Sequence, residues 1–548
     1  MFASLRRFGV ALCVAGLALV AWPGSAVAQR SLSRAEQRDL RLYDATLVLA
    51  RPAAGPALRR AGGVRIATVL PIWRLRSGPA LRVVPGLMRD GLVRAVDPDR
   101  PLSVANHLGD PLVPQEWWIP FVGADRAEPP GAGKPVTVID TGVDLTHVEF
   151  AGRPATTALN GQSTSARLEE HGTAVASVVA APTNGTGLVG VYPQAALQIW
   201  DASPLGIGIR AGDVINGLDA AIRRGPGVVN LSLGSQVRNP LLDAMIAYTI
   251  SSGTLVVAAA GNSGGAGSPL EYPASLPHVL TVGAIDQSGQ PTAFSSRSPY
   301  VDLAAPGLNI PIAVPATFSG TGYSTFSGTS FSSPMVAGAA AWIWTARPTL
   351  DVTQLFDVMR ASAQDISSPG FDPLSGFGRL DIPAALAVAP VTRDPQEPNE
   401  DVSYLKRNGL LHRASTPLTA ASRPRGTVGA RVEFAEDPRD VYRIWVPGRH
   451  TAFVALQPSG GDVDLALWGP RTVSVLEGGG ARRRDFRGLS ERRGRKRESL
   501  RVKNTGRRGA YYYAEASVGA GSGTAARRVA GISYGLSVSV VKTKSARR

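Results

Sequence analysis

Three side chains of this sequence are of the types that nucleophilic catalysis requires, and each stands at the edge of an apolar stretch. Asp140 ends the strand-like run VTVI, His171 opens a helix-like run of small residues, and Ser330 lies in a Gly/Ser/Thr turn ahead of another such run. An aspartate can orient a histidine, and that histidine can then deprotonate a serine hydroxyl. The three residues therefore predict a catalytic triad at the rim of an α/β scaffold.

Each of these positions also has an ordinary structural explanation. A serine ahead of a helix is most often an N-cap, and Asp140 or His171 alone could cap a turn or a helix. Asn262, in a glycine-rich turn, is common turn chemistry as well. The catalytic interpretation depends on all of these residues occurring together in one chain, and an inactive protein that keeps only the fold is the alternative.

The motifs around the three residues resemble the active-site motifs of subtilisin-like serine proteases, the subtilases. They are DTG at Asp140, HGT at His171 and GTSFSSP at residues 328–334. About half of the chain shares the resemblance, including the segments VVNLSLGS (228–235), VVAAAGNSG (256–264), EYPASLPHVLTVGA (271–284) and VDLAAPG (301–307). The resemblance implies a serine endopeptidase with an acyl-enzyme on Ser330 and with Asn262 as the side-chain donor of the oxyanion hole.

The same resemblance implies a cleft that takes the substrate as an added strand. The expected substrate-binding residues are Ser232, Leu233, Gly234, Ala258, Ala259, Gly261 and Glu271. The carboxylate of Glu271, at the base of the specificity pocket, could pair with a substrate Lys or Arg; in the alternative, it faces solvent or a neighbouring residue. Strict basic specificity is not expected, because the expected self-cleavage window, residues 101–115, contains no Lys or Arg.

A loop at residues 181–191 matches in position and length a calcium-holding loop of the family. Its expected ligands are the carboxylate of Glu149, the side chain of Asn184 and the carbonyls of Pro182, Thr186 and Leu188. Oxygen ligands suit a hard cation, although solvated loops often carry the same residues. The sequence thus predicts a structural calcium ion as a possible addition, and no organic cofactor is required.

Composition and charge place the chain among globular proteins with several domains. It has 548 residues, of which 44% are hydrophobic. The net charge is +9 for residues 1–110, −8 for 111–390 and +15 for 391–548, which together give +16. A basic N-terminal segment would be attracted to the acidic central segment.

The first 28 residues have the pattern of an export signal. Arg6 and Arg7 precede an apolar run at residues 10–22, and AVA at residues 26–28 is a small-residue cleavage site. A secreted, extracellular protein is therefore expected. An uncleaved membrane anchor is the alternative, but the run is short for a membrane span, and no later segment is long and apolar enough. The single cysteine, Cys13, lies in this signal, so no disulfide is expected in the mature chain.

Alternating strand-like and helix-like segments predict an α/β fold, a subtilisin-like three-layer arrangement with a central parallel sheet. We expect a signal peptide at 1–28, a small α+β pro-domain at 29–108, the catalytic domain at 109–390, a linker at 391–396 and a C-terminal β-sandwich domain at 397–548. The pro-domain would make the protein a zymogen and bind its own cleft. A permanent N-terminal domain is the alternative.

The C-terminal part contains short strand-like runs with turns, which is typical of a β-sandwich. With the motif EPNE at residues 397–400 it resembles the bacterial pre-peptidase C-terminal domain. Its basic insert, residues 481–499, is expected to be a loop that could bind an anionic polymer or envelope, or a solvated charged segment. Binding of nucleic acid is not expected, because no aromatic residues interleave the charges.

The sequence therefore predicts a secreted serine endopeptidase made as a zymogen, with protein or peptide substrates and its own pro-domain as partners. Two alternatives stay open at this point. One is a dedicated maturation protease of narrow specificity, and the other is a surface-binding protein whose protease fold is vestigial.

Overall fold

The computed structural model forms two compact units, residues 1–102 and 103–548, each described below by itself. It describes residues 32–543 apart from 42–43, 68, 100–108, 162–168, 205, 207, 392, 406–414, 477–484 and 524–530. The predicted signal peptide with Cys13, part of the self-cleavage window, residues 481–484 of the basic insert and most of the basic tail lie outside the described residues.

The first unit is a small α+β domain. Its antiparallel sheet has the order β2-β3-β1-β4, with the bounds Ala45–Ala50 (β1), Val64–Arg65 (β2), Ile72–Arg76 (β3) and Val93–Pro98 (β4). The helices are α1 (Arg34–Arg41), α2 (Gly55–Arg60) and α3 (Ser77–Arg89). Strand β1 alternates half-buried and buried residues, which is the pattern of a sheet with one face on a core. Leu58, Trp73 and Val84 lie in that core.

The second unit begins with the body that carries the predicted triad, residues 109–390, called here the catalytic body. Its centre is a seven-stranded parallel sheet of order β11-β10-β9-β8-β5-β7-β6. The strands are β5 (Val136–Asp140), β6 (Thr156–Ala158), β7 (Leu197–Asp201), β8 (Val228–Leu231), β9 (Leu255–Ala259), β10 (Val279–Ile285) and β11 (Leu303–Pro306). Every residue of β5, β8, β9 and β10 is buried, as expected for strands covered on both faces.

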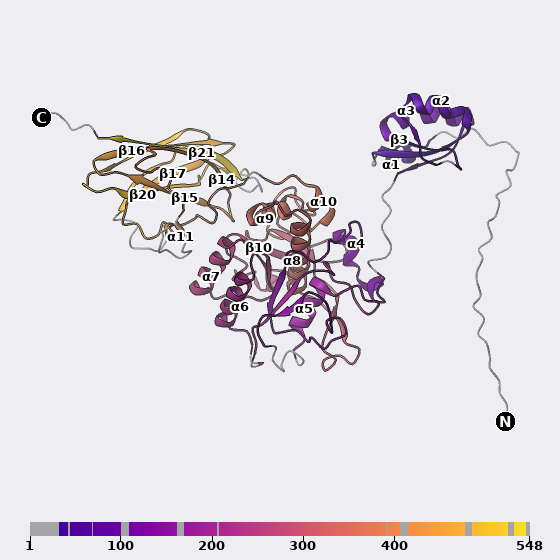
Figure 1. Ribbon diagram of the computed structural model, residues 1–548, viewed down its shortest axis with the longest axis horizontal. Coiled ribbons are helices and arrows are strands. Elements are labelled where there is room, and N and C mark those ends of the chain that lie inside the picture. Colours follow the sequence, from indigo (N-terminus) through magenta and orange to yellow (C-terminus); the bar gives the residue numbers. More distant parts are fainter. Residues whose placement is uncertain are drawn as a thin grey trace. The chain divides into compact units, whose positions relative to one another are not determined.

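Helices cover both faces of this sheet. They are α4 (Trp118–Val122), α5 (His171–Ala180), α6 (Ala211–Arg223), α7 (Pro240–Ser251), α8 (Thr329–Ala346), α9 (Val352–Ala361) and α10 (Ile382–Ala387), and a hairpin of β12 (Ile310–Ala313) and β13 (Tyr323–Phe326) lies beside α5. Successive strand residues point to opposite layers: Val138 packs with α5 and α8, whereas Ile139 packs with α6 and α7. Figure 1 shows α8 in the middle of this body. The predicted α/β fold with a central parallel sheet is confirmed.

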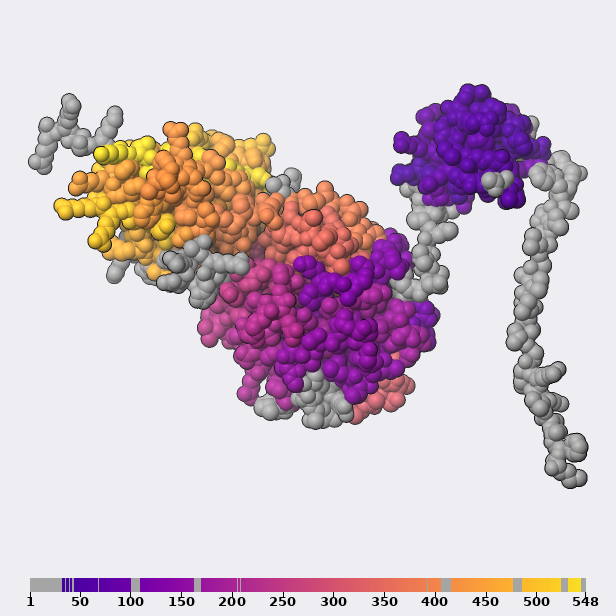
Figure 2. All heavy atoms as spheres, viewed as in Figure 1, coloured from indigo at the N-terminus to yellow at the C-terminus, as the bar shows by residue number. Residues whose placement is uncertain are grey.

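The C-terminal part is a sandwich of two antiparallel four-stranded sheets, ordered β14-β21-β16-β19 and β15-β20-β17-β18. The short helix α11 (Val402–Leu405) precedes the strands β14 (Arg425–Val432), β15 (Arg439–Val446), β16 (His450–Ser459), β17 (Val463–Trp468), β18 (Phe486–Ser490), β19 (Glu498–Asn504), β20 (Ala510–Val518) and β21 (Ile532–Lys542). Inward residues of both sheets, such as Val454 and Tyr512, share one core. The described part of the sandwich is coloured orange to yellow in Figure 2.

The described part of the basic insert is a loop flanked by two strands. Its described part contains strand β18 and the first residues of β19. These strands pair with β17 and β16, respectively. Among its described basic residues, Arg487 lies on β18, whereas Arg492, Arg493, Arg495, Lys496 and Arg497 lie in the loop between the two strands.

The sandwich meets the catalytic body through a set of charged side chains, called here the junction network. Nine acidic and three basic residues form it: Asp302, Asp357, Asp394, Glu397, Glu400, Glu433, Glu436, Asp437, Asp440, His278, Arg360 and Arg431. Arg360, only 2% exposed, pairs with Asp302 at 3.3 Å in the catalytic body and with Glu433 of the sandwich. Burial, together with the charge of Asp440, raises the pKa of Asp394 to about 8, and burial raises that of Asp440 to about 6.

Candidate active site

Asp140 is the last residue of β5 and is 1% exposed. Its Oδ1 accepts a hydrogen bond from the Thr141 backbone N–H at 2.8 Å and lies 2.7 Å from Nδ1 of His171. Because the carboxyl ends of parallel strands meet at one edge of a sheet, this position brings Asp140 to the rim where ligands bind in such folds. The pairing fixes the orientation of the imidazole ring.

His171 begins α5, and the residue after it explains how the helix comes so close to β5. A Cβ added at Gly172 would lie 2.0 Å from the backbone oxygen of Gly142, so only glycine fits there. The charge of Asp140 raises the pKa of His171, although burial opposes the rise. With Nδ1 facing Asp140, Nε2 is the ring nitrogen available to a nucleophile.

Ser330 is the second residue of α8, and Asn262 holds the start of that helix. Asn262 Oδ1 accepts from the Thr329 backbone N–H at 2.9 Å and from the Thr329 hydroxyl at 3.0 Å. The amide nitrogen of Asn262 is thereby left to donate elsewhere. A side-chain N–H beside the first turn of a helix can stabilise an oxyanion that forms near the serine.

The residue after the serine lies against the histidine ring. The ring centroid of Phe331, the residue after Ser330, is 6.0 Å from that of His171. The contacts of the described residues include no hydrogen bond from His171 to the Ser330 hydroxyl. Catalytic hydrogen bonds are often long in a free enzyme and tighten when the substrate binds.

A buried chain of polar side chains, which the sequence did not point out, ties α8 to the sheet. The Ser333 hydroxyl donates to Asn230 Oδ1 at 2.7 Å, Asn230 Nδ2 donates to Ser232 Oγ at 3.0 Å, and the Ser232 hydroxyl donates to the Ser330 carbonyl at 2.8 Å. Asn230 is fully buried in β8, where its neighbours are apolar. A lone asparagine in an apolar strand was the available signal, because a buried amide needs partners.

The expected substrate-binding residues lie along two adjacent strand ends. Ser232, Leu233 and Gly234 follow β8, while Ala258 and Ala259 end β9 and are followed by Gly261. Glu271 lies between these segments: its Oε2 would be 3.6 Å from a Cβ on Gly234, and its Cγ would be 2.6 Å from a Cβ on Gly261. Its Oε1 is 3.4 Å from the Gln236 amide nitrogen and the Ser263 hydroxyl, so the carboxylate has polar neighbours but no described basic partner.

Two carboxylates, those of Glu149 and Asp110, lie against the loop at residues 181–191, where the sequence predicts calcium. Glu149 Oε1 accepts from the Leu188 N–H at 2.9 Å and from the Tyr323 hydroxyl at 2.9 Å, and its buried Oε2 has no hydrogen-bond partner among the described residues. Asp110, which the sequence did not indicate, accepts from the N–H groups of residues 184 and 185. Burial raises the pKa of Glu149 to about 7. One unpartnered oxygen fits a cation ligand, and calcium at this loop stays a prediction.

Comparisons with known proteins give a family, related sequences and a solved structure. The model of the subtilase family matches residues 131–378. Subtilisin DY of Bacillus licheniformis is 34% identical over 275 residues, covering 49% of this chain and 97% of that protein. Subtilisin Savinase of Lederbergia lenta is 36% identical over 258 residues, covering 46% of this chain and 91% of that protein. The solved structure of fervidolysin from Fervidobacterium pennivorans, a keratinolytic enzyme related to subtilisin, aligns with a TM-score of 0.49 and 20% identity, over 83% of this chain and 84% of that one.

The family model and the two subtilisins define the class of the protein. The chain belongs to the subtilase family. It is a subtilisin-like serine endopeptidase.

Proposed function

We propose that this chain is a secreted endopeptidase, made as a zymogen, that cleaves protein substrates through an acyl-enzyme on Ser330. The observation that carries the proposal is the 2.7 Å contact between Asp140 Oδ1 and His171 Nδ1 beside α8, whose second residue is Ser330. One buried carboxylate, one imidazole and one hydroxyl in this order are the parts that acyl transfer requires.

The proposed reaction has two halves. His171 Nε2 takes the proton of the Ser330 hydroxyl while Oγ attacks the substrate carbonyl, and Asp140 stabilises the resulting imidazolium. Asn262 and the backbone N–H of Ser330 donate to the oxyanion. His171 then gives its proton to the leaving amine, which breaks the peptide bond. Water, deprotonated by His171, attacks the ester in the second half and releases Ser330.

Secretion and the zymogen form rest on the N-terminal part of the chain. The predicted signal precedes a compact α+β unit of the kind expected for a pro-domain that binds its own cleft. In the part of the chain that the structure describes, no helix has both the length and the apolar character needed to cross a membrane.

The test is the Ser330→Ala variant of the full chain. We expect a folded protein without casein hydrolysis that stays joined to its N-terminal unit, because the same site should make the first cut. A peptide library then separates broad cleavage by the parent protein from the narrow specificity of a dedicated maturation protease. Peptidase activity that persists in Ser330→Ala at the level of the parent would refute the proposal.

A second function is favoured by one observation on the sandwich. A groove of about 1000 Å³ lies on the sheet that contains β14, β21, β16 and β19. Its lining combines four arginines with small or polar residues and one aromatic ring: Arg425, Arg492, Arg497, Arg501, Thr427, Ser499, Ser537, Ser539 and Phe453. Arg425 and Phe453 both pair with β21 at Ser539, and Arg501 pairs with Phe453, so positive charge stands on both sides of the ring.

This groove suits an anionic polymer of the cell envelope, which would hold the protease at a surface. The test replaces Arg425 and Arg501 with serine in the Ser330→Ala chain and measures the salt concentration that elutes it from an anionic resin. Elution should move to lower salt than for the control with Arg507→Ser and Arg508→Ser, exposed residues outside the groove that carry equal charge. Equal elution of the two variants would mean that net charge, not the groove, binds the polymer.

A further inference from the structure

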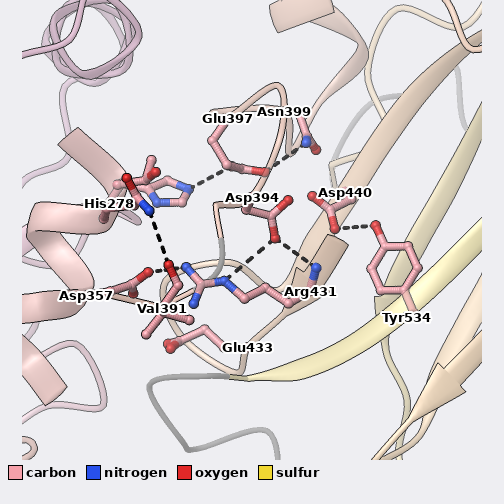
Figure 3. A network of polar contacts seen from close by, with 12 residues as sticks. His278, Asp357, Val391, Asp394, Glu397, Asn399, Arg431, Glu433, Asp440 and Tyr534 are labelled. Atoms are coloured by element: carbon pink, nitrogen blue, oxygen red, sulfur yellow. Dashed lines mark hydrogen bonds and ion pairs between the residues drawn. The ribbon is translucent and has the colours of Figure 1, made fainter. Parts of the chain in front are cut away.

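A small cavity lies in the junction network, whose side chains are drawn in Figure 3. It measures about 20 Å³, and its lining includes His278, Asp394, Glu397 and Asp437. A space of this size holds one particle as large as a water molecule. The His278 side chain belongs to the catalytic body, Asp394 to the linking segment, and Glu397 and Asp437 to the C-terminal part, so the cavity lies where these parts meet.

Acidic side chains outnumber basic ones around this cavity. The junction network has nine carboxyl groups against two arginines and one histidine. Arg360 is engaged with Asp302 and Glu433, and Arg431 with Asp357 and, more distantly, with Asp394 at 3.7 Å. The described ion pairs include no arginine contact to Glu397 or Asp440. Buried charge of one sign is costly unless a counter-charge is present.

Three carboxylates in the network share one arrangement. Each uses one oxygen to hold the protein: Asp394 Oδ2 accepts from the Arg431 N–H at 2.8 Å, Glu397 Oε1 accepts from the Asn399 amide at 2.8 Å, and Asp440 Oδ2 accepts from the Tyr534 hydroxyl. The second oxygen of each is buried and has no hydrogen-bond partner among the described residues. Figure 3 shows the three side chains converging.

The spacing of these groups matches the requirements of a hard cation. One oxygen from each of Asp394, Glu397 and Asp440 lies within 4.8 Å of the others. Two oxygens that bind the same calcium ion at about 2.3–2.6 Å can be no farther apart than roughly this distance. The side chains are nearly inaccessible, with 1% of Asp394, 4% of Glu397 and 0% of Asp440 exposed.

We propose that Asp394, Glu397 and Asp440 bind a calcium ion that fastens the C-terminal sandwich to the catalytic body. The ion supplies the counter-charge that the network lacks. Glu397 connects the ion to the catalytic body, because its Oε2 lies 3.5 Å from Nε2 of His278. Asp437 stands beside Glu397 in the neighbouring acidic group and adds negative charge to the site.

Calcium fits this site better than zinc for a chemical reason. Zinc sites in proteins use histidine or cysteine as ligands, and the one histidine here directs Nε2 at the carboxylate of Glu400. A nitrogen in that contact serves as a hydrogen-bond donor and is not free to bind a metal. The remaining ligands are carboxylate oxygens, which are typical of calcium.

The ion would also protect the segment that carries two of its ligands. Asp394 and Glu397 lie between α10 and α11, the stretch of chain that links the catalytic body to the sandwich. A cation bound to both residues and to Asp440 of β15 holds this stretch against the folded sandwich. In a protease, such a link resists cleavage as long as it stays folded.

The experiment uses the full chain with Ser330→Ala, which prevents self-cleavage and makes the result independent of the proposed activity. Metal is removed with EDTA, the EDTA is removed, and calcium alone is added while calorimetry measures bound ions and the melting temperature. We expect calcium to bind, to raise the melting temperature and to slow cleavage of residues 391–401 by an added protease.

The deciding variant is Asp440→Asn, whose side-chain oxygen can still accept from Tyr534. It should lose one equivalent of calcium or bind it at least tenfold more weakly, and in metal-free buffer it should be no less stable than the parent. Glu491→Gln, at an exposed acid of the same sandwich, is the matched control. Adding Glu149→Gln to each chain removes calcium binding at the loop of residues 181–191, so that only the junction site is counted.

Two outcomes would overturn the proposal. One is the same calcium stoichiometry and the same rise in melting temperature in Asp440→Asn as in Glu491→Gln. The other is a rise in melting temperature with zinc but not with calcium, which would assign the site to a different metal.

Discussion

The predicted catalytic site and the junction network both bring charged side chains together, but they balance charge in different ways. In the cleft, one carboxylate, Asp140, faces one imidazole, His171, and a backbone N–H. In the junction network, nine carboxyl groups surround three basic side chains. The cleft is therefore an orienting pair, and the junction network is a cluster with an excess of negative charge.

This difference separates two uses of buried charge. A single pair in the cleft holds one proton at a defined atom, which is what a general base needs. A cluster with excess negative charge gains little from orientation, and its stability depends on how many counter-charges it contains. Removing one charge should therefore destroy activity in the first case and change stability in the second.

The largest effect is expected for Asp140→Asn. Turnover should fall about 10⁴-fold, because an amide no longer favours the reactive tautomer or stabilises the imidazolium. The charge of Asp140 raises the pKa of His171 in the parent. Activity is lost when pH falls through that pKa, so the acidic limb of kcat/KM should lie at lower pH in the variant.

The control for this prediction is Asp219→Asn, at a half-exposed acid on α6 that pairs with Arg223. Its pH profile of kcat/KM should match that of the parent. An acidic limb that stays in place in Asp140→Asn would show that His171 is not the group that titrates.

A smaller effect, on stability, is expected for Arg360→Met. Losing one partner of a buried ion pair costs about 3–5 kcal/mol, because the remaining charges stay buried and unpaired. Arg360 contacts Asp302 and Glu433, both nearly inaccessible, so it holds the two bodies together. Calorimetry of the Ser330→Ala chain should show a lower melting temperature.

Arg223→Met provides the comparison, since its partner Asp219 is half exposed and such pairs contribute about 0–1 kcal/mol. Adding Glu433→Gln to Arg360→Met should restore part of the loss, because it removes one of the charges left unpaired. Equal destabilisation by Arg360→Met and Arg223→Met would show that the junction network does not depend on this pair.

The two regions also differ in how far the sequence could predict them. The parallel sheet was predictable because strand runs such as VTVID are short, apolar and local. The triad motifs put Asp140 and His171 at the ends of elements, where the structure also has them. The catalytic roles of these residues stay predictions. The polar chain through Asn230 was not predicted, because its hydrogen bonds join residues of β8 and its end to residues of α8 about a hundred positions later.

The junction network could not be predicted, since its members come from distant parts of the chain and no local pattern joins them. His278 and Glu400, for example, are 122 residues apart. The sequence indicates strands β14 and β18 only weakly, for a different reason. Their sequences, RGTVGARV and FRGLS, are rich in arginine and glycine, which weakens the alternation that indicates a strand.

The smallest effect concerns Glu271, an acid that belongs to neither cluster. It is partly exposed, lies against Gly234 and Gly261, and has the polar neighbours Gln236 and Ser263. A substrate Lys or Arg in the pocket would form a solvent-screened pair worth about 0.2–1 kcal/mol. Glu271→Gly should therefore lower the ratio of kcat/KM for Arg over Leu at P1 by about two- to fivefold, with little change for Leu or Phe. Matched peptides that differ only at P1 measure this ratio, and a ratio that does not fall would place Glu271 outside the specificity pocket.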